Sequence, residues 1–451
     1  MDEKMATVIF HIDVNSAFLS WTAAEQLKNG AEVDLRTIPA IIGGDQKSRH
    51  GIVLAKSLSA KACGIRTGEP VVNAFRKCGN LTMVPPDHRM YRQRSHELME
   101  YLMTFTPDIE QVSVDECYMD FTGIASRYSS PVDAANLIKE GVKKKFGFTV
   151  NIGISSNKLL AKMASDFEKP DKVHTLFPEE IQEKMWPLPI GELFMAGKSS
   201  VEALKNLEIN TIGDLAQANL DIVQLHLKSH GKMLWQFANG IGDSTVRTES
   251  TEAKGIGNST TLHKDATTAE ESKKVLLLLA ESVGGRLRKA GQKANMISVE
   301  IKYATFRVMS HQKQLTRATN ADDLIYRAAC ELFDEMWDES PIRLLGIRSS
   351  KLVDQGEPEQ LSLFDMQFES LTSNVNGISE QSVRVQKKVT DEKRKKLSAA
   401  MDAIRDKYGK DAIVRATLLE KVEKEKAGEN KAQKIEKTDE IEKMGEIEED
   451  D

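Results

Sequence analysis

The chain has 451 residues, of which 40% are hydrophobic and 29% are charged. This composition is typical of about two to four folded domains, and every apolar run is far shorter than the stretch of about 18 residues that spans a membrane. The net charge is −6, but residues 420–451 hold 13 acids and 7 lysines, so the first 419 residues carry 55 charges of each sign. Charge therefore neither favours nor excludes a nucleic-acid partner. The N-terminus lacks the basic and then apolar order of a signal peptide, so we expect a cytoplasmic protein.

Up to about residue 175, short apolar runs alternate with helical patterns. The run at 6–12 predicts a buried strand ending at Asp13, and 16–29 has the spacing of a helix that stops at Gly30. Short strands and turns fill 31–80. Further on we expect a strand at 81–84, a helix around 91–102, a strand–turn–strand at 110–121, a helix at 131–146, a strand at 148–154 and a helix at 157–167. Together they predict a mixed α/β domain around a central sheet.

The pattern changes along the rest of the chain. Residues 176–243 are helical in pattern, 246–254 are polar, and 255–353 again mix helices with strands. Beyond 354 the chain is polar, and 420–451 consist largely of Glu, Lys and Asp without aromatic residues. That composition favours a disordered or loosely helical tail.

Four cysteines occur, and no two are spaced like zinc ligands. In the cytosol such thiols stay reduced. We therefore expect small buried apolar side chains at all four positions: Cys63, Cys78, Cys117 and Cys330.

Three carboxylates suggest metal chemistry. Asp13 ends the first predicted strand, and Asp115 and Glu116 are adjacent in SVDECYMD at 113–120. Two-metal phosphoryl transfer needs carboxylates that converge from separate elements, and Mg²⁺ takes few protein ligands. Neighbouring strand residues point to opposite faces, so Asp115 and Glu116 can share metals only if the backbone bends there. Alone, an Asp-Glu pair is more often a solvated turn.

Three longer motifs make a metal site the better interpretation of these carboxylates. The segments HIDVNSAFLS at 11–20, SVDECYMD at 113–120 and GISSNKLLAKMASDFEKP at 153–170 resemble the three palm motifs of the Y-family DNA polymerases, in the same order. The resemblance covers about residues 6–365. It implies an α+β right-hand polymerase with a ferredoxin-like palm. The implied domains are a palm at 1–16 and 81–175, fingers at 17–80, a helical thumb at 176–245, a linker at 246–254, an α/β little finger at 255–353 and a tail at 354–451.

The resemblance also implies catalytic roles. Asp13 and Asp115 would bind both of two Mg²⁺ ions, Glu116 would complete the primer-side ion, and the carbonyl of Val14 would touch a metal. Phe18 falls at the steric gate, where a flat ring excludes a ribose hydroxyl. The implied activity is error-prone, template-directed addition of deoxynucleotides to a primer, used in DNA damage tolerance.

The triphosphate requires further cations. Lys169 matches the family's phosphate-binding lysine, and Lys162 precedes it by seven residues, which places both on one helical face. Lys61 lies where many relatives carry an arginine. Leu58 replaces a tyrosine of the family, so its contact to phosphate is expected from other groups: Ser16 and the backbone amides near Ala17 and Phe18.

Two regions resemble DNA-holding parts. Residues 188–216 resemble a helix–hairpin–helix, although Met195 stands where its first glycine is usual. Within the little finger, a basic set is expected to follow the phosphates of primer–template DNA: Arg286, Arg288, Lys289, Lys293, Arg307, Lys313 and Arg317. We expect a monomer.

The sequence QLSLF at 360–364 resembles a binding peptide for the bacterial sliding clamp. Apolar residues in a polar stretch suggest a partner, and such a tether raises effective concentration at the primer end. The expected contacts are Gln360, Leu361, Leu363 and Phe364.

Two other classes of function remain possible from the residues. A non-catalytic DNA-binding or clamp-adaptor protein would not need the carboxylates or Lys169. A nucleotide cyclase on a similar palm would not need the thumb, the basic final domain or QLSLF. The segment 387–419 is basic and then helix-like, which is compatible with either DNA binding or a protein partner.

Overall fold

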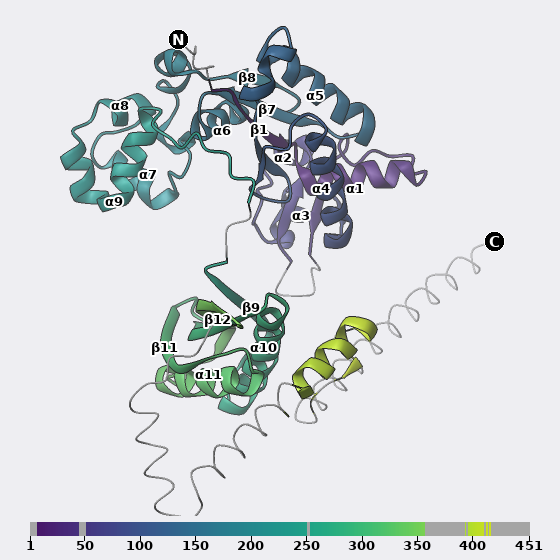
Figure 1. The fold of residues 1–451 in the computed structure, drawn as a ribbon, viewed down its shortest axis with the longest axis vertical. Coiled ribbons are helices and arrows are strands. Elements are labelled where there is room, and N and C mark those ends of the chain that lie inside the picture. The colour runs from purple at the N-terminus through teal and green to yellow at the C-terminus, as the bar shows by residue number, and fades with distance from the viewer. Residues whose placement is uncertain are drawn as a thin grey trace, which may run out of the picture. The chain divides into compact units, whose positions relative to one another are not determined.

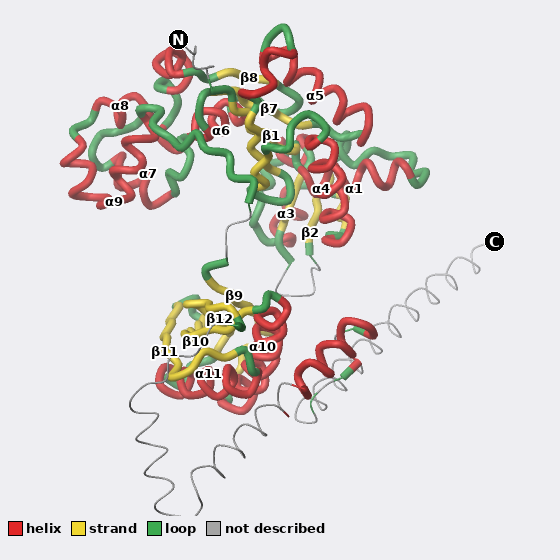
Figure 2. Tube along the Cα trace, viewed as in Figure 1, coloured by secondary structure: helices red, strands yellow, loops and turns green. Residues whose placement is uncertain are grey.

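A computed structural model describes residues 7–44, 51–249 and 253–356, together with 393, 396–409, 412–413 and 415. The chain divides into two compact units, Met1–Thr251 and Glu252–Asp451 (Figure 1). Figure 2 shows that each unit combines strands with helices, and that the part of the first unit around α7, α8 and α9 is helical.

A five-stranded sheet forms the centre of the first unit, with strand order β5-β6-β1-β7-β8. β1 pairs antiparallel with both β6 and β7, whereas β7 and β8 are parallel. The expected strand at 6–12 is confirmed as β1, and the strand–turn–strand at 110–121 as β5 and β6. The strands are β1 (Ile9–Val14), β5 (Ile109–Gln111), β6 (Glu116–Asp120), β7 (Val150–Ser155) and β8 (Val173–Thr175).

Different helices cover the two faces of this sheet. Alternate strand residues such as Phe10 and Ile12 point into a core shared with α4 (His88–Met103) and α5 (Pro131–Phe146). The other face carries α6 (Lys158–Asp166). This helix comes unusually close because Gly153 has no side chain, and a Cβ there would lie 2.0 Å from the Ala161 carbonyl oxygen. One glycine of the third motif therefore sets the distance between helix and sheet.

A small domain lies between β1 and α4 in the sequence. Its sheet has the order β3-β2-β4. The strand expected at 81–84 exists, but it pairs in parallel with β2 and not with the five-stranded sheet, so the small domain extends beyond the expected boundary at residue 80. Its elements are α1 (Ala17–Lys28), β2 (Ala40–Gly43), β3 (Val53–Lys56), α2 (Leu58–Ala62), α3 (Val71–Lys77) and β4 (Thr82–Val84).

The region from 178 to 238 is helical, as its pattern predicts. In the hairpin before α7, Met195 adopts φ 69°, a left-handed conformation that favours glycine. The methionine thus takes the backbone conformation of the glycine that the motif lacks. The elements here are η2 (Pro178–Glu180), η3 (Ile181–Met185), η4 (Ile190–Glu192), α7 (Lys198–Lys205), α8 (Ile212–Gln217) and α9 (Leu220–Ala238).

The second unit is a four-stranded antiparallel sheet with order β11-β10-β12-β9. Ile297, Val299 and Ile301 of β10 are buried against two helices, while Glu300 between them is exposed. One face of the sheet is therefore covered and the other is open. The elements are β9 (Gly255–Ala266), α10 (Ala269–Lys289), β10 (Gln292–Tyr303), β11 (Val308–Thr319), α11 (Asp322–Met336) and β12 (Ile342–Asp354).

Smaller expectations are met in part. Cys78 and Cys117 are buried, but Cys63 and Cys330 are partly exposed. The polar stretch at 246–254 does not begin as a free linker, because Val246 packs against the first unit's sheet and α6. In the part of the chain that the structure describes, no helix is long and apolar enough to cross a membrane.

Candidate active site

Asp13 and Glu116 are register partners on the paired strands β1 and β6. Both lie on the α6 side of the sheet, because the alternate residues of both strands point into the opposite core. Asp13 is buried and Glu116 is half-buried. Burial raises the pKa of Asp13 above its ordinary value, although the ammonium groups of Lys169 and Lys162 oppose the shift. Two carboxylates in this position therefore need cations.

The turn between β5 and β6 supplies the bend that Asp115 requires. Ser113 Oγ accepts hydrogen bonds from the N–H groups of Asp115, at 3.2 Å, and Glu116, at 3.0 Å. The same hydroxyl donates to Asp115 Oδ1 at 2.5 Å. The Asp115 carbonyl accepts from the N–H of Val14 at 3.0 Å, which holds Asp115 at the end of β1. We expected a bend here from the sequence, but not the hydroxyl that makes it.

Two lysines contact the carboxylates. Lys162 Nζ lies 2.7 Å from Glu116 Oε1 and 4.0 Å from Asp13 Oδ2. Lys169 forms an ion pair with Asp13 and lies 2.9 Å from Asp166. Burial lowers the pKa of Lys169, but the contacts with Asp13 and Asp166 together outweigh burial and the pKa is raised.

The expectation that Lys162 and Lys169 lie on one face of a single helix is wrong. The helix α6 ends at Asp166, and Lys169 lies in the turn that follows. The two lysines reach Asp13 from different elements, so different contacts hold each of them in position.

A buried amide fixes the turn that carries Lys169. Asn151 on β7 is fully buried, and its Nδ2 donates to the carbonyls of Ser165, at 3.0 Å, and Glu168, at 2.7 Å. Its Oδ1 accepts from Asn15 Nδ2 at 3.0 Å and from a backbone N–H at the end of the turn at 3.2 Å. Both donors and both acceptor positions of the amide are thus used. Sequence reasoning missed Asn151, and an asparagine within the apolar strand VNIGIS was the available signal.

The turn from β1 into α1 carries Ser16, Ala17 and Phe18. Ser16 has φ 47°, and its Oγ donates to the Lys56 carbonyl at 3.4 Å, so the turn contacts the small domain. The Phe18 ring stacks on Tyr91 with centroids 4.4 Å apart and planes 9° from parallel. This stacking holds the half-buried ring in one orientation at the end of β1.

The small domain contributes basic residues. Lys61 on α2 is exposed, and Leu58, which replaces the expected tyrosine, is exposed as well. Lys56 on β3 donates to Thr67 Oγ1 at 3.0 Å, and burial followed by the charge of Lys61 lowers the pKa of Lys56. Lys56 is a second cation of the small domain that the sequence analysis did not single out.

Several residues that were expected to contact DNA instead form ion pairs within the second unit. In the expected DNA-binding set, Arg288 Nη1 lies 2.7 Å from the buried Asp322, so its guanidinium is held within the second unit. Arg307 and Lys313 form ion pairs with acids of the same unit. The residues expected to bind the clamp lie outside the described part of the chain: Gln360, Leu361, Leu363 and Phe364.

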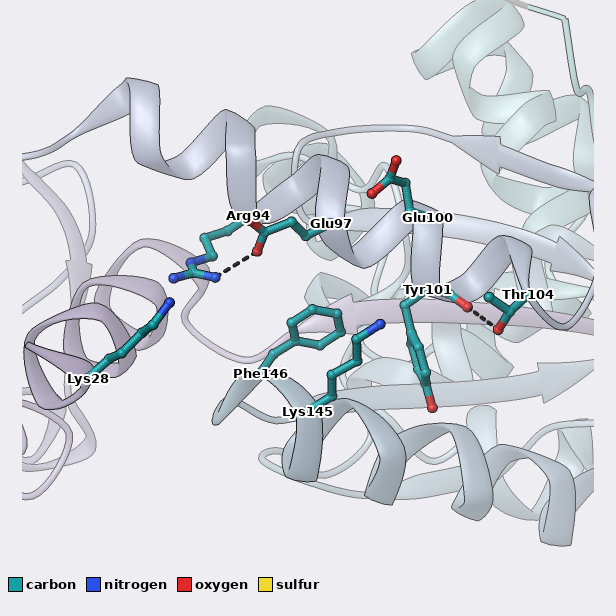
Figure 3. A pocket seen from close by; sticks show the side chains of 8 residues that line it. All are labelled: Lys28, Arg94, Glu97, Glu100, Tyr101, Thr104, Lys145 and Phe146. Carbon is teal, nitrogen blue, oxygen red and sulfur yellow. Dashed lines mark hydrogen bonds and ion pairs between the residues drawn. The ribbon is translucent and has the colours of Figure 1, made fainter.

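A hollow among α1, α4 and α5 is separate from this site (Figure 3). In it, Arg94 pairs with Glu97 at 2.6 Å, and Lys145 Nζ lies 5.0 Å from the Tyr101 ring centroid. None of the three carboxylates lines it. The lining residues are Lys28, Arg94, Glu97, Glu100, Tyr101, Thr104, Lys145 and Phe146.

The oxygen donors of the site suit magnesium, which takes its remaining ligands from phosphate and water. Within the described residues, no group of three or more His, Cys, Asp or Glu side chains could by itself hold a metal ion. Lys162 and Lys169 neutralise the carboxylates instead. The buried Asp13 and the two lysines together fit a site that substrate and metal complete.

Fold and site together define a polymerase of the Y-family type. Residues 12–166 match the impB/mucB/samB family, and residues 253–363 match the C-terminal domain of that family. The solved structure "Y-family DNA polymerase chimera Dbh-Dpo4(243-245)-Dbh" shares the fold with a TM-score of 0.66 and 22% identity, over 77% of this chain and 99% of that chain. The expected α+β right-hand fold is thereby confirmed.

Curated relatives match along almost the whole chain. DNA polymerase IV of Clostridium acetobutylicum is 48% identical over 93% of this chain and 100% of its own length. DNA polymerase IV of Alkaliphilus oremlandii is 37% identical over 92% and 100%. DNA polymerase IV 1 of Bacillus subtilis is 34% identical over 93% and 95%. The chain belongs to the impB/mucB/samB family of Y-family DNA polymerases, in the DNA polymerase IV group.

Proposed function

We propose that the chain is a DNA-directed DNA polymerase that adds deoxynucleotides to a primer 3′-hydroxyl and bypasses damaged template bases. The observation that carries the proposal is that Asp13 and Glu116 lie side by side on β1 and β6 and pair with Lys169 and Lys162, while the Val14 N–H holds the backbone of Asp115 next to them. The names of the relatives, DNA polymerase IV, support the reaction.

The three carboxylates, with the carbonyl of Val14, would hold two Mg²⁺ ions. When bound, these ions lower the pKa of the primer hydroxyl and neutralise the triphosphate. Lys162 and Lys169 pair with Glu116 and Asp13 and hold these side chains in place before substrate arrives. Each ammonium can then move to a phosphate oxygen, because it carries three donors on a flexible stem.

The incoming nucleotide contacts the side chains beside the five-stranded sheet and those of the small domain. Lys169 and Lys162 bind the triphosphate from the α6 side, and Lys61, with Lys56, binds it from the small domain. Amides near Ala17, with the Ser16 hydroxyl, supply donors at the β1–α1 turn. The fixed ring of Phe18 excludes a ribose hydroxyl.

DNA and the clamp bind outside the catalytic sheet. Primer–template DNA would follow basic side chains of the second unit and the hairpin before α7, through its phosphates rather than its bases. The sequence QLSLF at 360–364 would bind the sliding clamp and keep a monomer near the primer end. A small domain with short elements leaves room for a damaged template base.

Primer extension with Mg²⁺ tests the proposal. Asp115→Ala removes one carboxylate, whereas Asp120→Asn is a matched control because Asp120 lies at the other end of β6, where it accepts from the N–H of Thr122 at 2.9 Å. We expect template-directed extension by the wild type and by Asp120→Asn, and none by Asp115→Ala. No extension by the wild type, even with clamp and clamp loader, would overturn the proposal and favour the non-catalytic adaptor.

A further inference from the structure

Two acids of the second unit are almost completely buried. Glu281 on α10 is 6% exposed, and Asp322 at the start of α11 is 3% exposed. Arg288 Nη1 donates to Asp322 at 2.7 Å and to the Asn320 carbonyl at 2.7 Å. In the described residues, both ion pairs of Glu281 are with arginines close to the C-terminus. Among the described residues, those in 253–356 thus form no ion pair with Glu281.

The cations come from the end of the chain. A helix over 396–408 places Arg405 Nη2 2.8 Å from Glu281 Oε2. Arg415 Nε donates to the other oxygen of Glu281, and Arg415 Nη2 lies 3.8 Å from Asp322 Oδ2. Arg405 also donates to the carbonyl of Ile413 at 3.2 Å, two residues before Arg415 in the sequence.

The contact is reciprocal and includes close packing. Asp402 on the same helix accepts from Arg288 Nε at 2.6 Å and from Arg288 Nη2 at 3.0 Å. Met401 is buried. At Gly285 an added Cβ would lie 3.5 Å from Asp402 Oδ1, an ordinary van der Waals distance, so the helix lies close to α10 at this point.

The charges of this cluster balance only when the C-terminal residues are included. The whole cluster has three acids and three arginines: Glu281, Asp322, Asp402, Arg288, Arg405 and Arg415. Without the C-terminal residues, Glu281 and Asp322 would have only the guanidinium of Arg288 near them among the described side chains. A buried carboxylate without a partner is strongly destabilising, so α10 and α11 are built to receive a cationic segment.

We propose that the surface formed by α10 and α11 around Glu281 and Asp322 is the docking surface for the helix at 396–408 and for Arg415 of the same chain. The arginines of this segment therefore pair with acids of the second unit and do not bind DNA. This assigns a role to the basic segment at 387–419, whose sequence alone allows either DNA binding or a partner. It does not depend on the proposed polymerase activity.

The location agrees with that role. The two helices lie on the covered face of the sheet, so a segment docked on them lies across the sheet from its open face. The chain leaves the second unit after β12 and returns to it at 396.

Charge-removing variants of the full chain test the docking. Arg405→Gln with Arg415→Gln leaves Glu281 unpaired and should lower Tm by about 5 °C or more. Adding Glu281→Gln to these changes should restore part of the loss, because the buried charge is gone. The matched control is Arg307→Gln, which removes an exposed ion pair to Asp338 in the same unit and should change Tm by about 1 °C or less.

Salt dependence separates docking from DNA binding. If the two arginines contacted phosphates, their removal would reduce the slope of log K against log salt by about 0.9 per contact. We expect an unchanged slope. A reduced slope, or a loss of Tm that Glu281→Gln does not relieve, would overturn the proposal.

Hydrogen exchange of the wild-type protein gives a test that does not depend on a variant folding. Backbone amides of 396–408 should exchange more slowly than those of an isolated peptide with the same sequence. Equal rates would show that the helix is not docked, which would also overturn the proposal.

Discussion

Replacement of Ser113 with alanine should slow nucleotide addition without unfolding the protein. The change deletes the hydroxyl that accepts from the N–H groups of Asp115 and Glu116 and donates to the Asp115 carboxylate. The strand pairing next to the turn should remain, because the N–H groups of Val112 and residue 113 both donate to the Glu116 carbonyl. Asp115 then keeps its place in the chain but loses its fixed orientation.

The magnitude follows from the bonds that are lost. A neutral hydrogen bond contributes about 1 kcal/mol, and one to a charged group contributes about 1.5–3 kcal/mol. Water can replace part of this at a half-exposed turn, so we expect the free energy of unfolding to fall by about 1–2 kcal/mol. A misaligned metal ligand that costs about 1.4–2.8 kcal/mol in the transition state slows the reaction by about 10–100-fold.

Single-turnover incorporation of one nucleotide, measured against Mg²⁺ concentration, is the suitable assay. Ser130→Ala is a matched control, since Ser130 Oγ accepts from the Asp133 N–H at 3.1 Å and donates to its carboxylate at 2.8 Å, at the start of α5. It should lose similar stability at an unchanged rate, and Ser113→Thr should retain activity. A rate for Ser113→Ala within about twofold of wild type, with the same Mg²⁺ dependence, would refute the reasoning.

Three further outcomes are expected. Asn151→Ala should raise KM for deoxynucleotides about tenfold, because it loosens the turn that carries Lys169. The control Asn157→Ala removes the N-cap at the other end of α6 and should lower stability without changing KM. Equal KM values for the two variants would contradict the role of the Asn151 amide. Met195→Gly should raise the free energy of unfolding by about 0.5–1 kcal/mol in denaturant titration, because φ 69° suits glycine; a lower value would show that no strain is relieved. Phe18→Ala should reduce the deoxynucleotide-to-ribonucleotide ratio of kcat/KM about tenfold or more, and an unchanged ratio would exclude the ring as a sugar filter.

The framework of the site could be predicted because its signals are local. The apolar run at 6–12 located β1, and the motif around Asp115 and Glu116 located β6 together with the turn before it. These segments carry their own pattern of burial, so one sequence suffices to place the strands. The two motifs implied only that Asp13 and Glu116 share a site, and their pairing on adjacent strands is seen in the structure.

The remaining features depend on contacts between distant residues. Asn151 holds carbonyls of the turn after α6, 14 and 17 residues away, and nothing in its own segment shows that its amide is fully used. β4 is a short strand whose partner β2 could not be chosen from its composition. Lys169 lies outside α6, as the expected helix end at 167 already implied, but the sequence did not show that the turn after the helix brings Lys169 to Asp13.

Extension of a primer past an abasic template site tests the central claim most directly. The assay compares intact and abasic templates with the wild-type protein, and Asp115→Ala sets the background. The account predicts that the wild type inserts a nucleotide opposite the abasic site and continues, while Asp115→Ala extends neither template. Extension of the intact template with a complete stop at the abasic site would contradict a lesion-bypassing polymerase.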